Sequence, residues 1–322
     1  MQTIQILIVG DPVSTLKTQG DTSIALAEEA LRRNWEVFWC TPEALRLNSH
    51  PEVEVFASCV QVKRASVEGI ELSEPALART LSGFDSIWIR KDPPFDTTYW
   101  AWCGWLSLLE KRVLIQNAPH LFLMHHEKLL PFEGVERGYF ESSDLIETSV
   151  VLKTQEVQHN AEAWIQKPWL GHGGRGVEVL DWKRWNASMG TALPEPMMVQ
   201  PLVEAVHTVG DRRVFILDGQ VMGSFVRLPP EGSVRSNLAS GGRAVVRPMT
   251  EEEEVRAQKV ARFTKDLGFL WVGLDLLGGK ISEINFTSPT GVRTLQQLQS
   301  IDLAELYCDI IERQLKERAR AD

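Results

Sequence analysis

Three residues with oxygen-bearing side chains lie close together near the end of the chain. Asp275 precedes a glycine pair at 278–279, and Glu283 and Asn285 follow it. Because successive side chains of a strand point to opposite faces, Glu283 and Asn285 share one face, and a hairpin brings Asp275 across from them. Carboxylate and amide oxygens suit Mg²⁺, which is often shared with substrate phosphates. The alternative is a hairpin whose Asp and Asn serve only the local turn geometry.

A glycine-rich turn in the middle of the chain could hold a polyphosphate. Lys167 ends a predicted strand, and residues 171–176 contain four glycines. Glycine lets backbone N–H groups approach phosphate oxygens with no Cβ in the way, and a lysine adds positive charge. The pattern differs from a Walker motif, because the lysine precedes the turn and no helix follows. A flexible surface hairpin is the alternative, and Lys128 upstream together with a predicted strand at 198–202 favours a nucleotide site.

The stretch between Gly210 and Thr250 is cationic although the chain as a whole is acidic. It holds six arginines against three acidic residues, whereas the formal net charge of the protein is −9. A local cationic stretch in an acidic protein indicates a focused site for an anion. The alternative is a solvated basic face, and the glycines and small residues between the arginines favour the anion site.

The composition is typical of a soluble globular protein with two or three domains. The 322 residues are 43% hydrophobic and 24% charged, and a chain of this length exceeds one ordinary core. The acidic balance argues against a nucleic-acid partner, and no apolar run reaches the ~18 residues that span a bilayer. The four cysteines form no C-x-x-C pair, and the first residues read as a strand and not as a signal peptide. These features predict a cytoplasmic protein with no membrane partner.

The first part of the chain alternates strand and helix patterns. An apolar run over residues 2–9 predicts a buried strand, and Asp21 is placed to cap a helix that extends to Asn34. Further strands are predicted at 36–40, 53–62, 85–90 and 112–116. This βαβ rhythm predicts an open, mostly parallel sheet of Rossmann-like type. Ligands bind such sheets at the carboxyl ends of the strands, where the loop 90–96 lies.

Three further helices are predicted along the chain. The helix at 98–110 carries three tryptophans, which indicate core or an interface more than a cofactor site. Thr250 opens a capping box before a helix that ends near Leu267. A final helix at 302–318 has apolar residues along one face.

Taken in order, these motifs resemble the ATP-grasp architecture and, more narrowly, the bacterial glutathione synthetase family. The similar segments are residues 90–96, 167–168, 211–214, 227–243 and 283–290. They cover nearly the whole chain in the order of the family. The resemblance implies an α/β ATP-grasp fold preceded by a Rossmann-like, mostly parallel sheet domain. It implies a substrate-binding domain at 1–119, a lid subdomain at 120–199 and a C-terminal subdomain with the metal site at 200–322.

The resemblance also implies roles for the residues at matching positions. ATP would be bound by Lys128, Lys167, Gly171, Gly173, Gly174 and Gln200. Mg²⁺ or Mn²⁺ would be held by Asp275, Glu283 and Asn285. The catalytic positive charges would be those of Arg213, which neutralises the transferring phosphoryl group, and Arg235. The other substrates would contact Asp92, Arg227, Arg243 and Arg293.

The reaction that the resemblance implies is the ATP-dependent ligation of glycine to the cysteinyl carboxylate of γ-glutamylcysteine. It passes through an acyl phosphate, so the loop 230–243 is expected to close and exclude water. Relatives in the family are commonly homo-oligomers, and we expect the same here. Two alternatives stay open: another ATP-grasp carboxylate–amine ligase with a different acceptor, and a nucleotide-binding regulator without turnover. The complete set of metal-ligating residues argues against the regulator.

Overall fold

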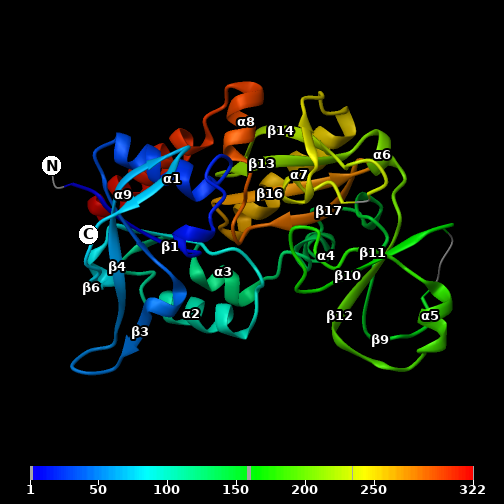
Figure 1. Ribbon diagram of the computed structural model, residues 1–322, viewed down its shortest axis with the longest axis horizontal. Helices are drawn as coiled ribbons and strands as arrows, with labels where there is room; N and C mark the ends of the chain where they lie inside the picture. The colour runs from blue at the N-terminus through cyan, green and yellow to red at the C-terminus, as the bar shows by residue number, and fades with distance from the viewer. Residues whose placement is uncertain (1–2, 158–160, 234, 322) are drawn as a thin grey trace.

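Three β-sheets organise the part of the chain that the structure describes. The computed structural model describes residues 3–157, 161–233 and 235–321, so Gln2 of the first predicted strand and Val234 of the predicted closing loop lie outside it. Figure 1 shows the N-terminal sheet at one end of the molecule and a sheet formed by β9–β12 at the other. The C-terminal sheet, formed by β13–β17, lies between them.

The N-terminal sheet is parallel on one side and antiparallel on the other. The parallel strands are, in their order across the sheet, β2 (Glu36–Cys40), β1 (Gln5–Gly10), β7 (Ser86–Arg90) and β8 (Leu114–Gln116). The antiparallel strands are β3 (Leu45–Asn48), β4 (Glu54–Ser66), β5 (Gly69–Leu72) and β6 (Leu77–Thr80). The sequence predicted a mostly parallel sheet. For the strand predicted at 53–62 this is wrong, because β4 pairs with β2 in the antiparallel direction. The connection from β2 contains β3 and no crossover helix, and a parallel return needs such a crossover.

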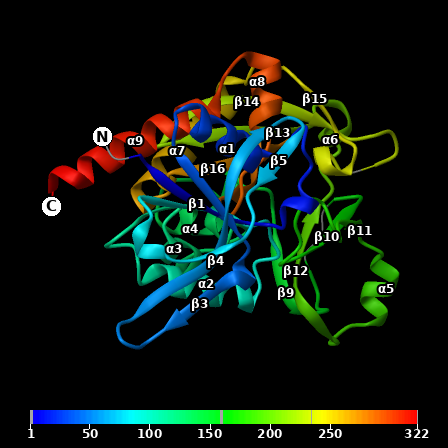
Figure 2. The ribbon, with the colours of Figure 1, turned by 60° about the vertical axis from the view of Figure 1, so that its left-hand side comes forward.

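Helices cover both faces of the N-terminal sheet. They are α1 (Thr22–Arg32), α2 (Thr97–Ser107), α3 (Pro119–Met124) and the C-terminal α9 (Leu303–Ala321). Figure 2 shows α1 and α9 on one side of the sheet and α2 and α3 on the other. Asp21 caps α1, since its carboxylate accepts from the backbone of Ser23 at 2.7 Å and of Ile24 at 3.1 Å. The predicted cap is confirmed.

The second sheet, which we call the lid sheet, is antiparallel and small. It contains β9 (Ser149–Lys153), β10 (Trp164–Pro168), β11 (Glu178–Val179) and β12 (Ala192–Pro201), beside α5 (Trp182–Ala187). Its buried side chains, among them Trp164, Trp185 and Val199, form a hydrophobic cluster of their own. Such a separate core lets the lid sheet behave as a unit distinct from the rest of the molecule.

The C-terminal sheet is covered by a helix on each face. Its strands are β13 (Asp211–Leu217), β14 (Gln220–Leu228), β15 (Arg243–Val245), β16 (Trp271–Leu277) and β17 (Lys280–Asn285). Along β13, Val214 and Ile216 share a cluster with α7 (Glu251–Leu267), whereas Phe215 and Leu217 share one with α8 (Val292–Gln299). The alternation of side chains along the strand explains this division.

The helix boundaries follow from local signals. Thr250 and Glu253 form the predicted capping box at the start of α7, with backbone-to-side-chain bonds of 3.0 and 3.2 Å. Gly268 ends the same helix in the left-handed region, at φ 93°, where glycine avoids the strain of a Cβ. No described helix is both long and apolar enough to cross a membrane.

The N-terminal and C-terminal sheets share their hydrophobic cores. Leu7 of β1 and Val272 of β16 belong to one cluster, and Leu121 and Leu130 join it from α3 and α4 (Leu130–Glu136). The buried apolar side chains of residues 119–136 therefore belong to the core that these two sheets share, whereas the lid sheet, whose strands span 149–201, has a separate core. The short α6 (Ala205–Thr208) then leads into β13. The domain boundaries at 119/120 and 199/200 stay predictions.

Asn117 joins the two larger sheets through a buried set of hydrogen bonds. Its Nδ2 donates to the carbonyls of Trp271 and Phe286, each at 2.9 Å. Its Oδ1 accepts from the backbone N–H groups of Leu270 and Trp271, each at 3.0 Å. The side chain is 7% exposed, so water does not replace these partners easily. Asn117 thus fixes the segment before α3 against both strands of the predicted metal hairpin.

Replacing Asn117 tests this junction. The variant Asn117→Ala leaves backbone donors and acceptors buried without partners, and we expect it to lower the free energy of unfolding by about 3 kcal/mol. Urea unfolding monitored by circular dichroism measures the change. Asn186→Ala, at an exposed position of α5, is the control and should change stability by less than about 0.5 kcal/mol. Equal stability of the two variants would show that the junction is not needed.

Candidate active site

The hairpin of β16 and β17 brings the three predicted metal ligands together. Asp275 pairs directly with Glu283 across the two strands, and Asn285 pairs with Gly273. Glu283 and Asn285 are two residues apart on β17, so their side chains share a face. The Asn285 amide Nδ2 donates to Asp275 Oδ2 at 3.1 Å. The structure therefore shows the geometry that the alternation of the sequence predicts.

Two lysines approach Glu283 from outside the hairpin. Lys128, from the loop between α3 and α4, places Nζ 3.1 Å from Glu283 Oε1 and 2.6 Å from the carbonyl oxygen of Gly171. Lys167, from the end of β10, also acts on Glu283 electrostatically. Burial alone would raise the pKa of Glu283, but the two lysines outweigh it and bring the pKa below its usual value. Glu283 is therefore anionic at neutral pH.

Lys167 has a different environment from Lys128. Burial lowers the pKa of Lys167, and the nearby charge of Lys128 lowers it further, although Glu283 acts in the opposite direction. Lys128 and Lys167 disfavour each other's positive charge even with Glu283 beside them, so the region around them favours an additional negative group. A polyphosphate is such a group.

Asp275 is held by two arginines of the neighbouring strands. Arg213 on β13 binds both carboxylate oxygens, with Nε 2.6 Å from Oδ1 and Nη2 3.1 Å from Oδ2. Arg227 on β14 adds a contact of 2.9 Å to Oδ1. Burial would raise the pKa of Asp275, but the two guanidinium groups hold it below its usual value. Asp275 thus fixes in place Arg213, which was predicted to neutralise the transferring phosphoryl group, and Arg227, which was predicted to contact a substrate.

Asp211 connects this network to the predicted closing loop. It forms an ion pair with Arg227, and its Oδ2 accepts from Ser236 Oγ at 2.8 Å. Burial raises the pKa of Asp211, and the neighbouring charge of Asp275 adds to this effect against that of Arg227. Ser236 belongs to the loop 230–243, so Asp211 anchors that loop beside the site.

The closing loop contacts the glycine-rich turn of the lid sheet. Arg235 Nη2 donates to the carbonyl of Val177 at 3.0 Å, and Ser240 Oγ donates to the carbonyl of Gly173 at 3.2 Å. A Cβ on Gly174, which has φ 79°, would stand 2.8 Å from Asn237 Oδ1. Glycine at this position allows the close approach of the two loops. The glycine-rich turn and the closing loop are therefore in direct contact.

An aromatic contact joins the turn to the Lys128 loop. The rings of His126 and Trp169 stack with centroids 4.5 Å apart and an interplanar angle of 15°. Burial, with the nearby charge of Lys128, lowers the pKa of His126 to about 4. The imidazole is therefore neutral at pH 7 and stacks as an uncharged ring.

Gln200, at the end of β12, is 3% exposed and donates to Thr148 Oγ1 at 2.6 Å.

The remaining predicted substrate residues lie around this centre with partners of their own. Asp92 hydrogen-bonds to Ser288, and burial raises its pKa. Arg293 on α8 pairs with Glu28 of α1 at 2.5 Å. Arg243 is exposed at the start of β15. The substrate roles of these residues stay predictions.

The donor set fits a hard divalent cation. Asp275 and Glu283 supply two carboxylates that are anionic at neutral pH, and the donation by Asn285 Nδ2 leaves its amide Oδ1 for a ligand. Oxygen ligands of this kind suit Mg²⁺ or Mn²⁺. Within the described residues no group of three His, Cys, Asp or Glu side chains is arranged for a metal. An ion at this hairpin would therefore share its coordination with phosphate or water.

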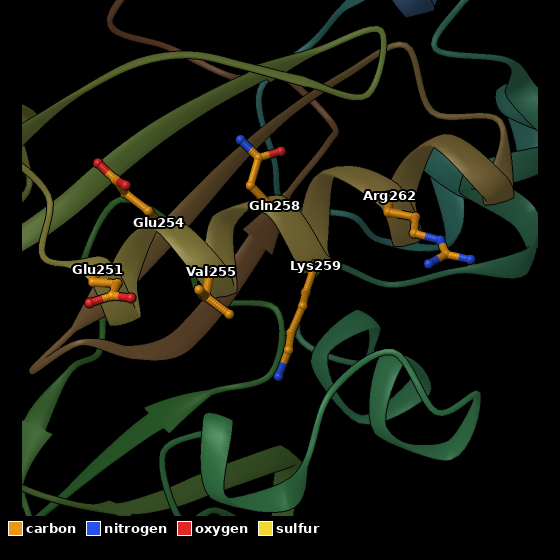
Figure 3. Close-up of a pocket in the computed structure, with 6 residues that line it drawn as sticks. All are labelled: Glu251, Glu254, Val255, Gln258, Lys259 and Arg262. Carbon is orange, nitrogen blue, oxygen red and sulfur yellow. The ribbon is translucent and has the colours of Figure 1, made fainter.

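A surface depression elsewhere on the molecule is separate from this centre. Figure 3 shows its lining side chains along α7: Glu251, Glu254, Val255, Gln258, Lys259 and Arg262. None of these residues is among the predicted ATP, metal or substrate ligands. Lys259 is engaged with Asp144 at 2.8 Å. We therefore place the chemistry at the hairpin and not at this depression.

Comparison with known proteins identifies the family. The profile of the prokaryotic glutathione synthetase N-terminal domain matches residues 4–122, and that of the ATP-grasp domain of the same enzymes matches residues 140–300. The chain belongs to the prokaryotic glutathione synthetase family. Among the curated members of the glutathione synthetase family, the Mesorhizobium japonicum protein is 32% identical, covering 96% of this chain and 98% of the relative. The Vibrio cholerae protein is also 32% identical, covering 98% and 99%.

Solved structures of lower identity share the fold. The ATP-grasp ligase PsnB with its precursor peptide and AMPPNP matches with a TM-score of 0.60 at 15% identity, covering 98% of this chain and 99% of that one. D-Cycloserine synthetase DcsG matches with a TM-score of 0.63 at 15% identity, covering 96% and 99%. The predicted ATP-grasp fold is confirmed for this glutathione synthetase family member.

Several residues of the site were not predicted from the sequence. They are His126, Trp169, Asp211, Ser236 and Glu127, whose Oε1 accepts from Thr287 Oγ1 just after β17. Each lies within two residues of a predicted ligand or inside a predicted loop. Closeness in sequence to a predicted site residue is therefore the feature that could have indicated them. What the sequence did not contain was the identity of their partners, which come from distant segments.

Glu283 offers the sharpest test of the site. The variant Glu283→Gln removes the negative charge beside Lys128 and the predicted metal, and we expect turnover to fall at least about 100-fold. Its circular dichroism spectrum should match that of the unchanged protein. Phosphate release with ATP, Mg²⁺ and both substrates measures the turnover. Glu68→Gln, at an exposed pair with Arg64, is the matched control, and unchanged activity of Glu283→Gln would rule out the metal assignment.

Proposed function

We propose that this protein is a glutathione synthetase. It is an ATP-dependent carboxylate–amine ligase that joins glycine to the cysteinyl carboxylate of γ-glutamylcysteine, with ADP and phosphate as the other products. The observation that carries the proposal is the convergence of Lys128, Lys167 and the Asp275–Glu283 pair at one hairpin. Membership of the family over nearly the full chain supports the choice of substrates.

The residues present supply positioning and charge for phosphoryl transfer. A carboxylate is a poor electrophile, so it is first phosphorylated, and this step depends more on charge stabilisation than on covalent help from the protein. Lys128 and Lys167, which both lie near Glu283, would bind phosphate oxygens, and Arg213 is held by both oxygens of Asp275. Asp275, Glu283 and Asn285 would hold Mg²⁺, which supplies further neutralisation of phosphate charge.

Exclusion of water is assigned to the closing loop and the glycine-rich turn. An acyl phosphate hydrolyses in open water, so the site must be covered while glycine attacks. Arg235 donates to the carbonyl of Val177, directly after the turn, and Ser240 donates to the carbonyl of Gly173 within it. These contacts support a role for the loop in keeping the lid sheet over the intermediate.

We also infer a cytoplasmic location and a homo-oligomeric state. All four cysteines are free and buried, which suits a reducing compartment. The tryptophan-bearing helix α2 leaves Trp100 54% exposed, and this side chain is available to a second copy. The measurement that tests the second inference is the mass in solution by light scattering, and a monomer at micromolar concentration would contradict it.

A phosphate-release assay separates the proposed function from its alternatives. We expect release with ATP and Mg²⁺ only when γ-glutamylcysteine and glycine are both present, because the amine completes the turnover. Release with another amine and not with glycine would indicate a ligase with a different acceptor. Binding of ATP without release under any combination would indicate a regulator and overturn the proposal.

The role of the closing loop leads to a second measurement. The variant Arg235→Ala removes a contact of 3.0 Å to the turn, so water should reach the acyl phosphate more often. We expect the ratio of phosphate to glutathione to rise above one, with turnover lowered about tenfold. Arg184→Ala on the exposed side of α5 is the control and should keep the ratio at one. A ratio of one in both variants would show that Arg235 does not exclude water.

A further inference from the structure

Glu127 connects the loop that carries Lys128 to the end of β17, and it has no role in the mechanism described above. It is half-buried in the loop between α3 and α4, directly before Lys128. Its Oε1 accepts three hydrogen bonds, from the backbone N–H groups of Phe286 and Thr287 at 2.8 and 2.9 Å and from Thr287 Oγ1 at 2.8 Å. Hydrogen bonds to a carboxylate are stronger than those between neutral groups.

The bonded segment is the direct continuation of the metal strand. Phe286 and Thr287 follow Asn285 at the end of β17, and they are 1% and 3% exposed. Their N–H groups lie beyond the last residue of the strand, and in the structure Glu127 is their hydrogen-bond acceptor. The position of the strand end therefore depends on a side chain about 160 residues away in the sequence.

Glu127 and its neighbour form a two-point connection to β17. Lys128 binds Glu283 within the strand at 3.1 Å, and Glu127 binds the backbone just after it. A shift of the loop would therefore move Lys128 relative to Glu283 and Asp275. Misplacement of reacting groups by about 1 Å costs on the order of 100-fold in rate, so the register of these two segments matters for the reaction.

We infer that Glu127 is a positioning residue that fixes the loop carrying Lys128 in register with the strand that carries Glu283 and Asn285. This inference rests on the proposed function for its effect on turnover, but the structural connection exists without it. Glu127 acts through hydrogen-bond geometry. A side chain that accepts the same bonds without charge should therefore replace it.

Two variants of Glu127 separate geometry from general stability. Glu127→Gln keeps an oxygen that accepts the three bonds, and we expect turnover within about threefold of the unchanged protein. Glu127→Ala removes the acceptor, and we expect turnover to fall on the order of 100-fold, with weaker binding of AMPPNP in the presence of Mg²⁺. Glu133→Ala, which removes a carboxylate paired with His125 on the same segment, is the matched control and should retain turnover and AMPPNP binding.

Hydrogen exchange gives a readout that does not need activity. In the ligand-free protein, the amides of Phe286 and Thr287 should exchange on the order of tenfold faster in Glu127→Ala. Exchange should be restored in Glu127→Gln and unchanged in Glu133→Ala. Slow exchange in Glu127→Ala would overturn the inference, as would a Glu127→Gln variant as impaired as Glu127→Ala.

The proposed function and the positioning role of Glu127 are tested by different outcomes. If the unchanged protein releases no phosphate with γ-glutamylcysteine and glycine, the proposed function fails, and the exchange measurement still decides whether Glu127 holds the strand end. If turnover is present and Glu127→Ala keeps it at full rate while folded, the positioning role fails and the proposed function stands.

Discussion

The constraint on which the rest of the structure depends is the balance of buried charge around one hairpin. Asp275 and Glu283 are paired across β16 and β17, and each has cations of its own: Arg213 and Arg227 for the former, Lys128 for the latter. Removing one partner of a buried ion pair costs about 3–5 kcal/mol. The carboxylates and their cations therefore have to come together as the protein folds, before any ligand is bound.

This balance explains how the three sheets are joined. The cations of Asp275 stand on neighbouring strands of the same sheet, whereas Lys128 comes from a loop that packs with the core shared by the N-terminal and C-terminal sheets. The lid sheet has a core of its own and meets the centre through polar contacts such as Lys128 with Gly171 and Arg235 with Val177. Each such hydrogen bond contributes only about 1 kcal/mol net, so the lid sheet is the part best able to open.

The sequence was sufficient where a local pattern determines the structure. Alternation around a glycine pair predicted a hairpin of the segments 273–277 and 282–285, and the capping box at Thr250 predicted the start of α7; both are confirmed. The direction of the strand at 53–62 could not be predicted in this way, because parallel and antiparallel strands differ in their connections and only weakly in their own residues. That Asp275, Glu283 and Asn285 share one face could be predicted because residue type and spacing together select a face of the hairpin; their role as metal ligands stays a prediction. Their neighbours Asp211 and Glu127 were not predicted, since pairing across many positions leaves no local signal.

For the same reason, the type of a residue does not predict which partners surround it in the fold. Arg213 and Arg293 are both arginines near predicted substrate positions, yet the structure gives them different surroundings. The first is held by both oxygens of Asp275, a bidentate arrangement that fixes the plane of the guanidinium. The second pairs with Glu28 of another helix and leaves Nε without a hydrogen-bond partner. In the proposed reaction, a phosphoryl group beside Arg213 would meet a guanidinium whose orientation Asp275 already fixes, and such preorganised charge makes electrostatic stabilisation most effective. For the second, contact with a substrate carboxylate requires exchange of an existing partner, so its contribution depends on how strongly Glu28 competes.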